Sequence, residues 1–176
     1  MGDDGARVAM RNKNGPIVRL KNGAFKIELT DDHREVLKQL IEELRETLIS
    51  SSDDAALRRL FPTAYNNDPQ KDAEYQRLMR DELLASRLTS TETALKTIES
   101  KTEISEHDLD AFSRSINSMR LVIGTNLDIS ESDYGRKREE SNRDDDADGE
   151  TEIQTELYEY LGWLLEWTVI AQSEGL

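Results

Sequence analysis

The stretch TDDHREVLKQLIEELRETLIS, residues 30–50, decides the fold. Thr30 is a favourable helix N-cap, and Asp31 and Asp32 complement the positive end of the helix dipole. Apolar residues then recur at steps of three and four, which predicts a helix that buries one face. That apolar stripe consists of Val36, Leu37, Leu40, Ile41, Leu44 and Leu48.

Four further helices are predicted downstream of this one. A short helix over 53–61 is capped by Asp53 or Asp54 and stops before Pro62. A long helix begins at Asp68-Pro69 and runs to about residue 100, with room for a break among 86–93, where short polar and β-branched residues cluster. The last two occupy 105–127, opened by a Ser105 cap, and 150–173.

The N-terminal region reads as strands rather than helix. Segments 17–21 and 24–29 flank Asn22-Gly23, a strong hairpin signal when both turn residues adopt positive φ. Segment 7–11 is a candidate third strand. We therefore predict a single, mainly α domain over residues 1–176. Its parts are a β-hairpin region (6–29), helices one to four (30–127), a flexible acidic linker (128–149) and a C-terminal helix (150–173).

Composition excludes several classes of function. The chain has no cysteine, so disulfides, thiolate zinc sites and cysteine nucleophiles are absent. It contains no apolar run of the roughly 20 residues that a membrane span needs, and its acidic N-terminus is no signal peptide, so we expect a cytoplasmic protein without membrane contact. The formal net charge of −14 disfavours nucleic acid as a partner, and residues 139–152 alone carry −7.

Searches for catalytic and metal-binding motifs find none. The chain lacks a G-x-S-x-G elbow, a dinucleotide-binding glycine loop and a phosphate-binding loop. Neither His33 nor His107 belongs to a Glu-x-x-His pair. Asp144, Asp146 and Asp148 resemble the start of a calcium loop, but Thr155 stands where its closing glutamate belongs. We expect no enzyme activity, no cofactor and no metal.

One stretch, residues 58–68, differs from its surroundings because it combines arginines, aromatics and a proline in a connection between helices. Such loops are frequent at binding sites, although the same residues also serve packing at the end of a bundle. Arg120, which lies within an apolar run of the fourth helix, could likewise serve either binding or packing. The candidate partner-binding residues are therefore Arg59, Phe61, Tyr65, Asp68 and Arg120.

Three motifs support a resemblance to a known family. They are R-L-F-P-x-A-Y (59–65), R-L-V-I-G-T-x-L (120–127) and Y-x-Y-L-G-W-L (158–164). In this order they resemble the actinobacterial domain-of-unknown-function family numbered two thousand and seventeen. The resemblance implies a cytoplasmic protein with no assigned enzyme activity. Members tend to be encoded near the adaptor of the Clp protease, which points to stress response or proteolysis-linked regulation.

The hypothesis that follows is a non-enzymatic interaction or regulatory protein that binds another protein of unknown identity. One alternative is a transcriptional regulator that contacts DNA through Arg19, Lys21 and Lys26 of the hairpin. Another is an enzyme that uses carboxylates in a deep pocket. A homodimer is also open, because Trp163 and Trp167 offer more aromatic surface than one core buries.

Overall fold

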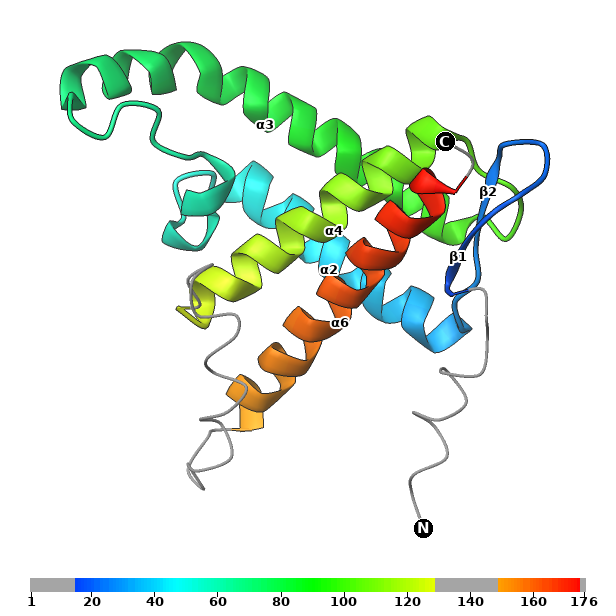
Figure 1. Ribbon diagram of the computed structural model, residues 1–176. Helices are drawn as coiled ribbons and strands as arrows, with labels where there is room; N and C mark the ends of the chain where they lie inside the picture. Colours follow the sequence, from blue (N-terminus) through cyan, green and yellow to red (C-terminus); the bar gives the residue numbers. More distant parts are fainter. Residues whose placement is uncertain (1–14, 129–148, 175–176) are drawn as a thin grey trace.

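The structure is a computed structural model that describes residues 15–128 and 149–174 (Figure 1). Over those residues it contains a two-stranded sheet, four α-helices and one 3-10 helix, so the fold is mainly α with a small β-hairpin, as the sequence predicts. The elements are β1 (Ile17–Arg19), β2 (Phe25–Ile27), α2 (Asp31–Ser50), η1 (Ala55–Leu60), α3 (Pro69–Glu99), α4 (Glu106–Asn126) and α6 (Gly149–Ser173).

The predicted caps begin the helices where expected. The Thr30 hydroxyl accepts from the His33 N–H at 3.3 Å at the start of α2, and the Asp68 carboxylate accepts from the Lys71 N–H at 3.1 Å at the start of α3. Ser105 and Asp108 form a reciprocal capping box on α4. The short second helix is a 3-10 helix capped by Asp54, whose carboxylate accepts from the Ala56 N–H at 2.8 Å.

The third helix runs to about residue 100 as predicted, and the possible break among residues 86–93 does not occur, because α3 is continuous from Pro69 to Glu99. Its hydroxyl side chains donate back to carbonyls of the preceding turn. Thr89 donates to the Ala85 carbonyl at 2.9 Å, and Thr97 donates to the Thr93 carbonyl at 2.8 Å. These bonds satisfy the hydroxyls within the helix, so the polar cluster does not interrupt it.

The expected two-residue hairpin turn is wrong. Of its two residues only Gly23 has a positive φ, of 84°. The Gly23 N–H donates to the Leu20 carbonyl at 3.0 Å, and the Leu20 N–H donates to the Ala24 carbonyl at 2.8 Å. The connection is therefore a three-residue loop in which the left-handed residue follows an ordinary turn. As a result the strands are shorter than predicted, with Ile17 paired to Ile27 and Arg19 to Phe25.

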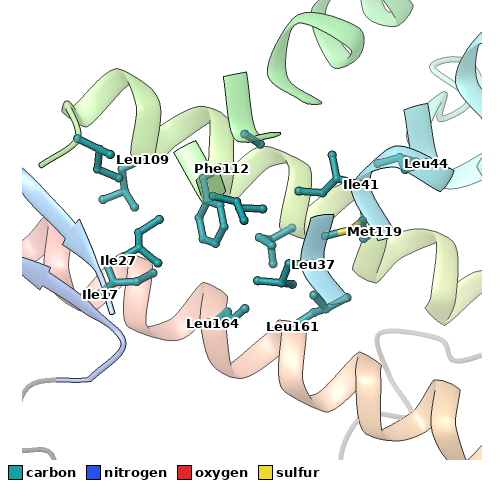
Figure 2. Packing of buried hydrophobic residues seen from close by; sticks show 14 of the residues in the cluster. Ile17, Ile27, Leu37, Ile41, Leu44, Leu109, Phe112, Met119, Leu161 and Leu164 are labelled. Carbon is teal, nitrogen blue, oxygen red and sulfur yellow. The ribbon is translucent and has the colours of Figure 1, made fainter. Parts of the chain in front are cut away.

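Helix α4 lies at the centre of the bundle, where it contacts α2, α3, α6 and η1 (Figure 1). The core gathers around Phe112 of α4, which is fully buried. Figure 2 shows Leu37 of α2 and Leu161 of α6 pointing into the same core. Ile17 and Ile27 close one end of this core (Figure 2). The hairpin is held there by a bridge between Phe25 and Ile104, with N–H to carbonyl distances of 2.9 and 2.8 Å.

Two sequence predictions fall outside the described residues. These are the third strand at 7–11 and the flexible acidic linker, of which only the two end residues, 128 and 149, are described.

Candidate functional site

The five residues predicted to bind a partner divide into two groups in the structure. Phe61, Tyr65 and Asp68 lie along the connection from η1 to α3. By contrast, Arg120 lies against the ring of Tyr158 on α6, and Arg59 and Tyr158 both come close to Gly124. The structure therefore places these residues in two environments, the connection from η1 to α3 and the surroundings of Gly124.

Phe61 is a packing residue, only 6% exposed. Two arginines of α3 cover its ring: the Arg80 guanidinium carbon lies 4.2 Å from the ring centroid and that of Arg87 lies 5.9 Å away. Arg87 also donates to the Leu60 carbonyl at 2.7 Å and to the Ser118 hydroxyl at 3.0 Å, and burial lowers its pKa. Neither arginine is among the residues predicted from the sequence, although their spacing of seven places them on one face of the helix.

Asp68 and Tyr65 have different environments. Asp68 caps α3 and also pairs with Lys71 at 3.7 Å, so it stabilises the start of the helix. Tyr65 is 47% exposed and makes an edge contact with Tyr75 at 6.2 Å between ring centroids. The Asp72 carboxylate accepts the N–H groups of Ala64 and Tyr65 at 2.7 and 3.2 Å and so holds the loop against α3.

The three family-like motifs meet at one point, which we call the motif cluster: Arg59, Arg120, Gly124 and Tyr158. The Arg120 guanidinium lies 4.5 Å from the centroid of the Tyr158 ring, a cation–π geometry. A Cβ atom added to Gly124 would lie 2.9 Å from Tyr158 Cε2 and 3.3 Å from Arg59 Nη1. The absent side chain of Gly124 therefore lets η1, α4 and α6 approach one another here.

A second group of side chains forms what we call the aromatic face: His33 and Val36 of α2 with Tyr160 and Trp163 of α6. The rings of His33 and Tyr160 make an edge contact at 5.2 Å, and those of Tyr160 and Trp163 stack at 5.8 Å. Val36 follows His33 by one turn on the same side of α2. Val36 is 42% and Trp163 is 37% exposed, so this face presents apolar surface to solvent.

Tyr160 has an unusual position within the aromatic face. Its hydroxyl oxygen is buried and has no hydrogen-bond partner among the described residues. Burial raises the pKa of Tyr160 to about 12, because the phenolate loses hydration. The ring therefore acts as an apolar spacer between α2 and α6.

Exposed acidic side chains adjoin the aromatic face on both α2 and α6. By helical spacing, Glu159 and Glu166 adjoin Trp163, and Asp32 adjoins Val36, and all three are exposed. Helix α6 contains five glutamates and neither lysine nor arginine. Over the described ranges, none of these glutamates forms an ion pair.

The basic residues of α2 lie on another side of that helix. The Arg34 guanidinium donates to the Ile27 carbonyl at 2.6 Å and to the Leu29 carbonyl at 3.3 Å. Lys38 pairs with Glu99 of α3 at 3.1 Å, and this partner raises its pKa. The negative charges beside the aromatic face are therefore not neutralised by these two cations.

The structure also describes residues of the two alternative functions, DNA binding through the hairpin and catalysis by carboxylates in a pocket. Arg19 of the hairpin donates to the Gln172 carbonyl at 3.2 Å, and Lys26 pairs with Glu28 at 3.5 Å. A surface hollow of about 260 Å³ beside η1 is lined by Asp53 and Asp54 among others. Asp53 pairs with Arg80 at 3.2 Å and Asp54 caps η1. DNA binding and carboxylate catalysis both stay predictions.

Residues 15–128 and 149–174 contain neither a candidate metal site nor a candidate membrane-spanning helix. No group of three or more histidine or acidic side chains lies close enough to hold a metal ion. None of the helices there combines the length and the apolar character that crossing a membrane requires.

The comparisons with known proteins give one match. No curated protein and no solved structure matches the chain significantly. A family model described as a domain of unknown function, DUF2017, matches residues 12–172, which include the motif cluster and the aromatic face. The chain therefore belongs to the DUF2017 family.

Proposed function

We propose that this protein is a non-enzymatic, intracellular interaction protein that binds another protein through its aromatic face. The observation that carries the proposal is the exposure of Trp163, which stacks on the ring of Tyr160, together with the exposure of Val36, one helical turn from the His33 ring that contacts Tyr160. Clustered aromatic and aliphatic side chains that remain in contact with solvent are typical of protein-binding surfaces.

The motif cluster supports this assignment by its position. Arg59, Gly124 and Tyr158 join η1, α4 and α6 on one side of α6. Tyr158 is buried, whereas Trp163 on another side of the same helix is partly exposed. We infer that the cluster fixes the orientation of α6, and that this orientation presents the aromatic face.

The test is affinity capture of the tagged full-length chain from a native lysate. Trp163→Ala on the aromatic face is compared with Val169→Ala, which removes an apolar side chain that is 63% exposed on another side of α6. We expect Trp163→Ala to lose a partner that the unchanged chain and Val169→Ala retain. Circular dichroism checks that each variant folds. The identity of the partner then tests the proposed role in stress response or proteolysis-linked regulation.

Tyr65→Ala is captured in parallel, because Tyr65 is the exposed aromatic residue of the loop proposed from the sequence. If Tyr65→Ala loses the partner and Trp163→Ala keeps it, the loop is the docking surface and the aromatic face is not. If all folded variants retain every partner, neither surface carries the interaction.

A further inference from the structure

The aromatic face combines two properties that together define a class of partner. Its centre is apolar and aromatic, and its edge is negatively charged. The edge includes three exposed side chains that neighbour Val36 or Trp163 at a helical spacing of three or four residues: Asp32, Glu159 and Glu166. We propose that the occupant of this face is a positively charged amphipathic segment of the partner protein, an inference that rests on the proposed function.

Charge favours lysine or arginine around the periphery of the bound segment. Carboxylates on both α2 and α6 attract cations, and the net charge of −14 adds a long-range attraction that speeds encounter with a basic partner. The indole of Trp163 also attracts cations through its ring face. Lysine and arginine can place their aliphatic stems on Val36 and Trp163 and direct their charges to the carboxylates.

The apolar centre requires an apolar anchor on the same segment. Val36 and Trp163 are each more than one third exposed, so a bound leucine or aromatic residue would remove apolar area from water. An amphipathic helix presents such an anchor between charged positions. A purely polar basic tail would leave the centre of the face hydrated and would bind more weakly.

The same charges disfavour a second copy of this chain as the occupant. A two-fold interface would place each protomer's aromatic face, with its three neighbouring carboxylates, against the other. Like charges brought together in this way repel unless protonation or a bound cation relieves them. Charge complementarity therefore selects a basic partner over a homodimer.

The test uses two synthetic helical peptides with one leucine face, one with lysine at every polar position and the other with glutamate. Binding to the full-length chain is measured by isothermal titration calorimetry. We expect binding of the lysine peptide at least about tenfold tighter than that of the glutamate peptide, and a loss of that preference in high salt. Equal affinity for both peptides would overturn the proposal.

Variants then show whether the lysine peptide binds at the aromatic face. Trp163→Ala should weaken binding by about tenfold, as truncation of a central aromatic residue does, whereas Val169→Ala should not. The double variant Glu159→Gln with Glu166→Gln should weaken it by several-fold. Its matched control, Glu74→Gln with Glu82→Gln, removes the same charge from exposed positions of α3. Equal weakening by both charge pairs would mean non-specific attraction and would overturn the proposal.

Two further outcomes separate this inference from the proposed function. If Trp163→Ala loses its captured partner but the chain does not prefer the lysine peptide, the interaction function stands and the basic chemistry is wrong. If sedimentation shows a dimer that Trp163→Ala dissociates, the occupant is a second copy and the inference fails.

Discussion

At the scale of the residue, Tyr160 couples burial to the pH dependence of stability. Its pKa is about 12 in the folded chain, whereas an unfolded tyrosine titrates near 10. Because the folded pKa is raised, this contribution to stability is complete below about pH 10 and is lost as pH rises towards 12. We predict that Tyr160→Phe abolishes this part of the alkaline loss, measured by urea unfolding at pH 9 to 12.

The same substitution tests the buried hydroxyl at neutral pH. The Tyr160 hydroxyl has no partner among the residues that the structure describes, so its removal abolishes an uncompensated desolvation cost. We expect Tyr160→Phe to raise the free energy of unfolding by about 1 kcal/mol. A loss of stability of similar size would show that the hydroxyl has a favourable partner in solution. Tyr65→Phe, at an exposed ring, is the control and should be neutral.

Gly124 tests how closely the family-like motifs pack. Alanine normally stabilises a helix interior by about 1 kcal/mol over glycine. Here the new Cβ would lie 2.9 Å from Tyr158 Cε2, and Tyr158 is buried beneath Arg120. Overpacking of this kind costs about 1–3 kcal/mol, so we predict that Gly124→Ala lowers the free energy of unfolding by about 1 kcal/mol. Gly149→Ala, with open space around it, should not; denaturant unfolding compares them.

At the scale of the element, local signals in the sequence were sufficient where a few neighbouring residues decide the structure. Thr30, Asp68 and Ser105 cap helices as predicted, because a cap depends on a side chain and the next three residues. The break left open in α3 does not occur, because Thr89 and Thr91 bond back to carbonyls of their own helix. The prediction of a two-residue hairpin turn was wrong because Asn22-Gly23 fits more than one turn geometry.

The capping box of α4 provides a prediction at this scale. The Ser105 hydroxyl and N–H donate to the Asp108 carboxylate and lower its pKa below the ordinary 3.8. Ser105→Ala should cost about 1 kcal/mol in chemical unfolding. Because the folded pKa is lowered, this stabilisation is present above pH 3.8 and is lost as pH falls through the folded value. The difference between the unchanged chain and Ser105→Ala should therefore shrink in acid. Ser86→Ala, at an exposed position of α3, should cost less at every pH.

At the scale of the whole molecule, the fold class and the order of elements followed from periodicity, but the candidate site did not. Arg59, Arg120 and Tyr158 lie on three separate elements, and nothing local to each indicates that they meet. The aromatic face could not be predicted for the same reason, since His33 and Tyr160 are in contact but far apart in the chain. The sequence did indicate exposed aromatic surface on α6 through Trp163 and Trp167 together, and of these two Trp163 is the exposed one in the structure.

The charge of the whole chain determines the sign of its response to salt. Screening weakens attractive pairs such as Lys38 with Glu99, and it also weakens repulsion among unpaired acids. With a net charge of −14, repulsion dominates. We predict that raising ionic strength from about 0.01 to about 0.15 M, which shortens the screening length from about 30 to about 8 Å, stabilises the protein. The gain should be about 0.5–1 kcal/mol, the scale of exposed charge interactions.

The glutamates of α6 contribute directly to this repulsion, because the helix has five of them and no lysine or arginine. The double variant Glu156→Gln with Glu159→Gln, at exposed positions beyond the first turn of α6, should therefore be more stable than the unchanged chain at low salt and should gain less from added salt. Glu92→Gln is the control, since Glu92 pairs with Lys96 at 3.3 Å and its loss removes an attraction. Thermal unfolding at both ionic strengths measures the difference. A chain that loses stability as salt is added would show that attractive pairs outweigh the repulsion, and the charge basis of a preference for basic partners would weaken with it.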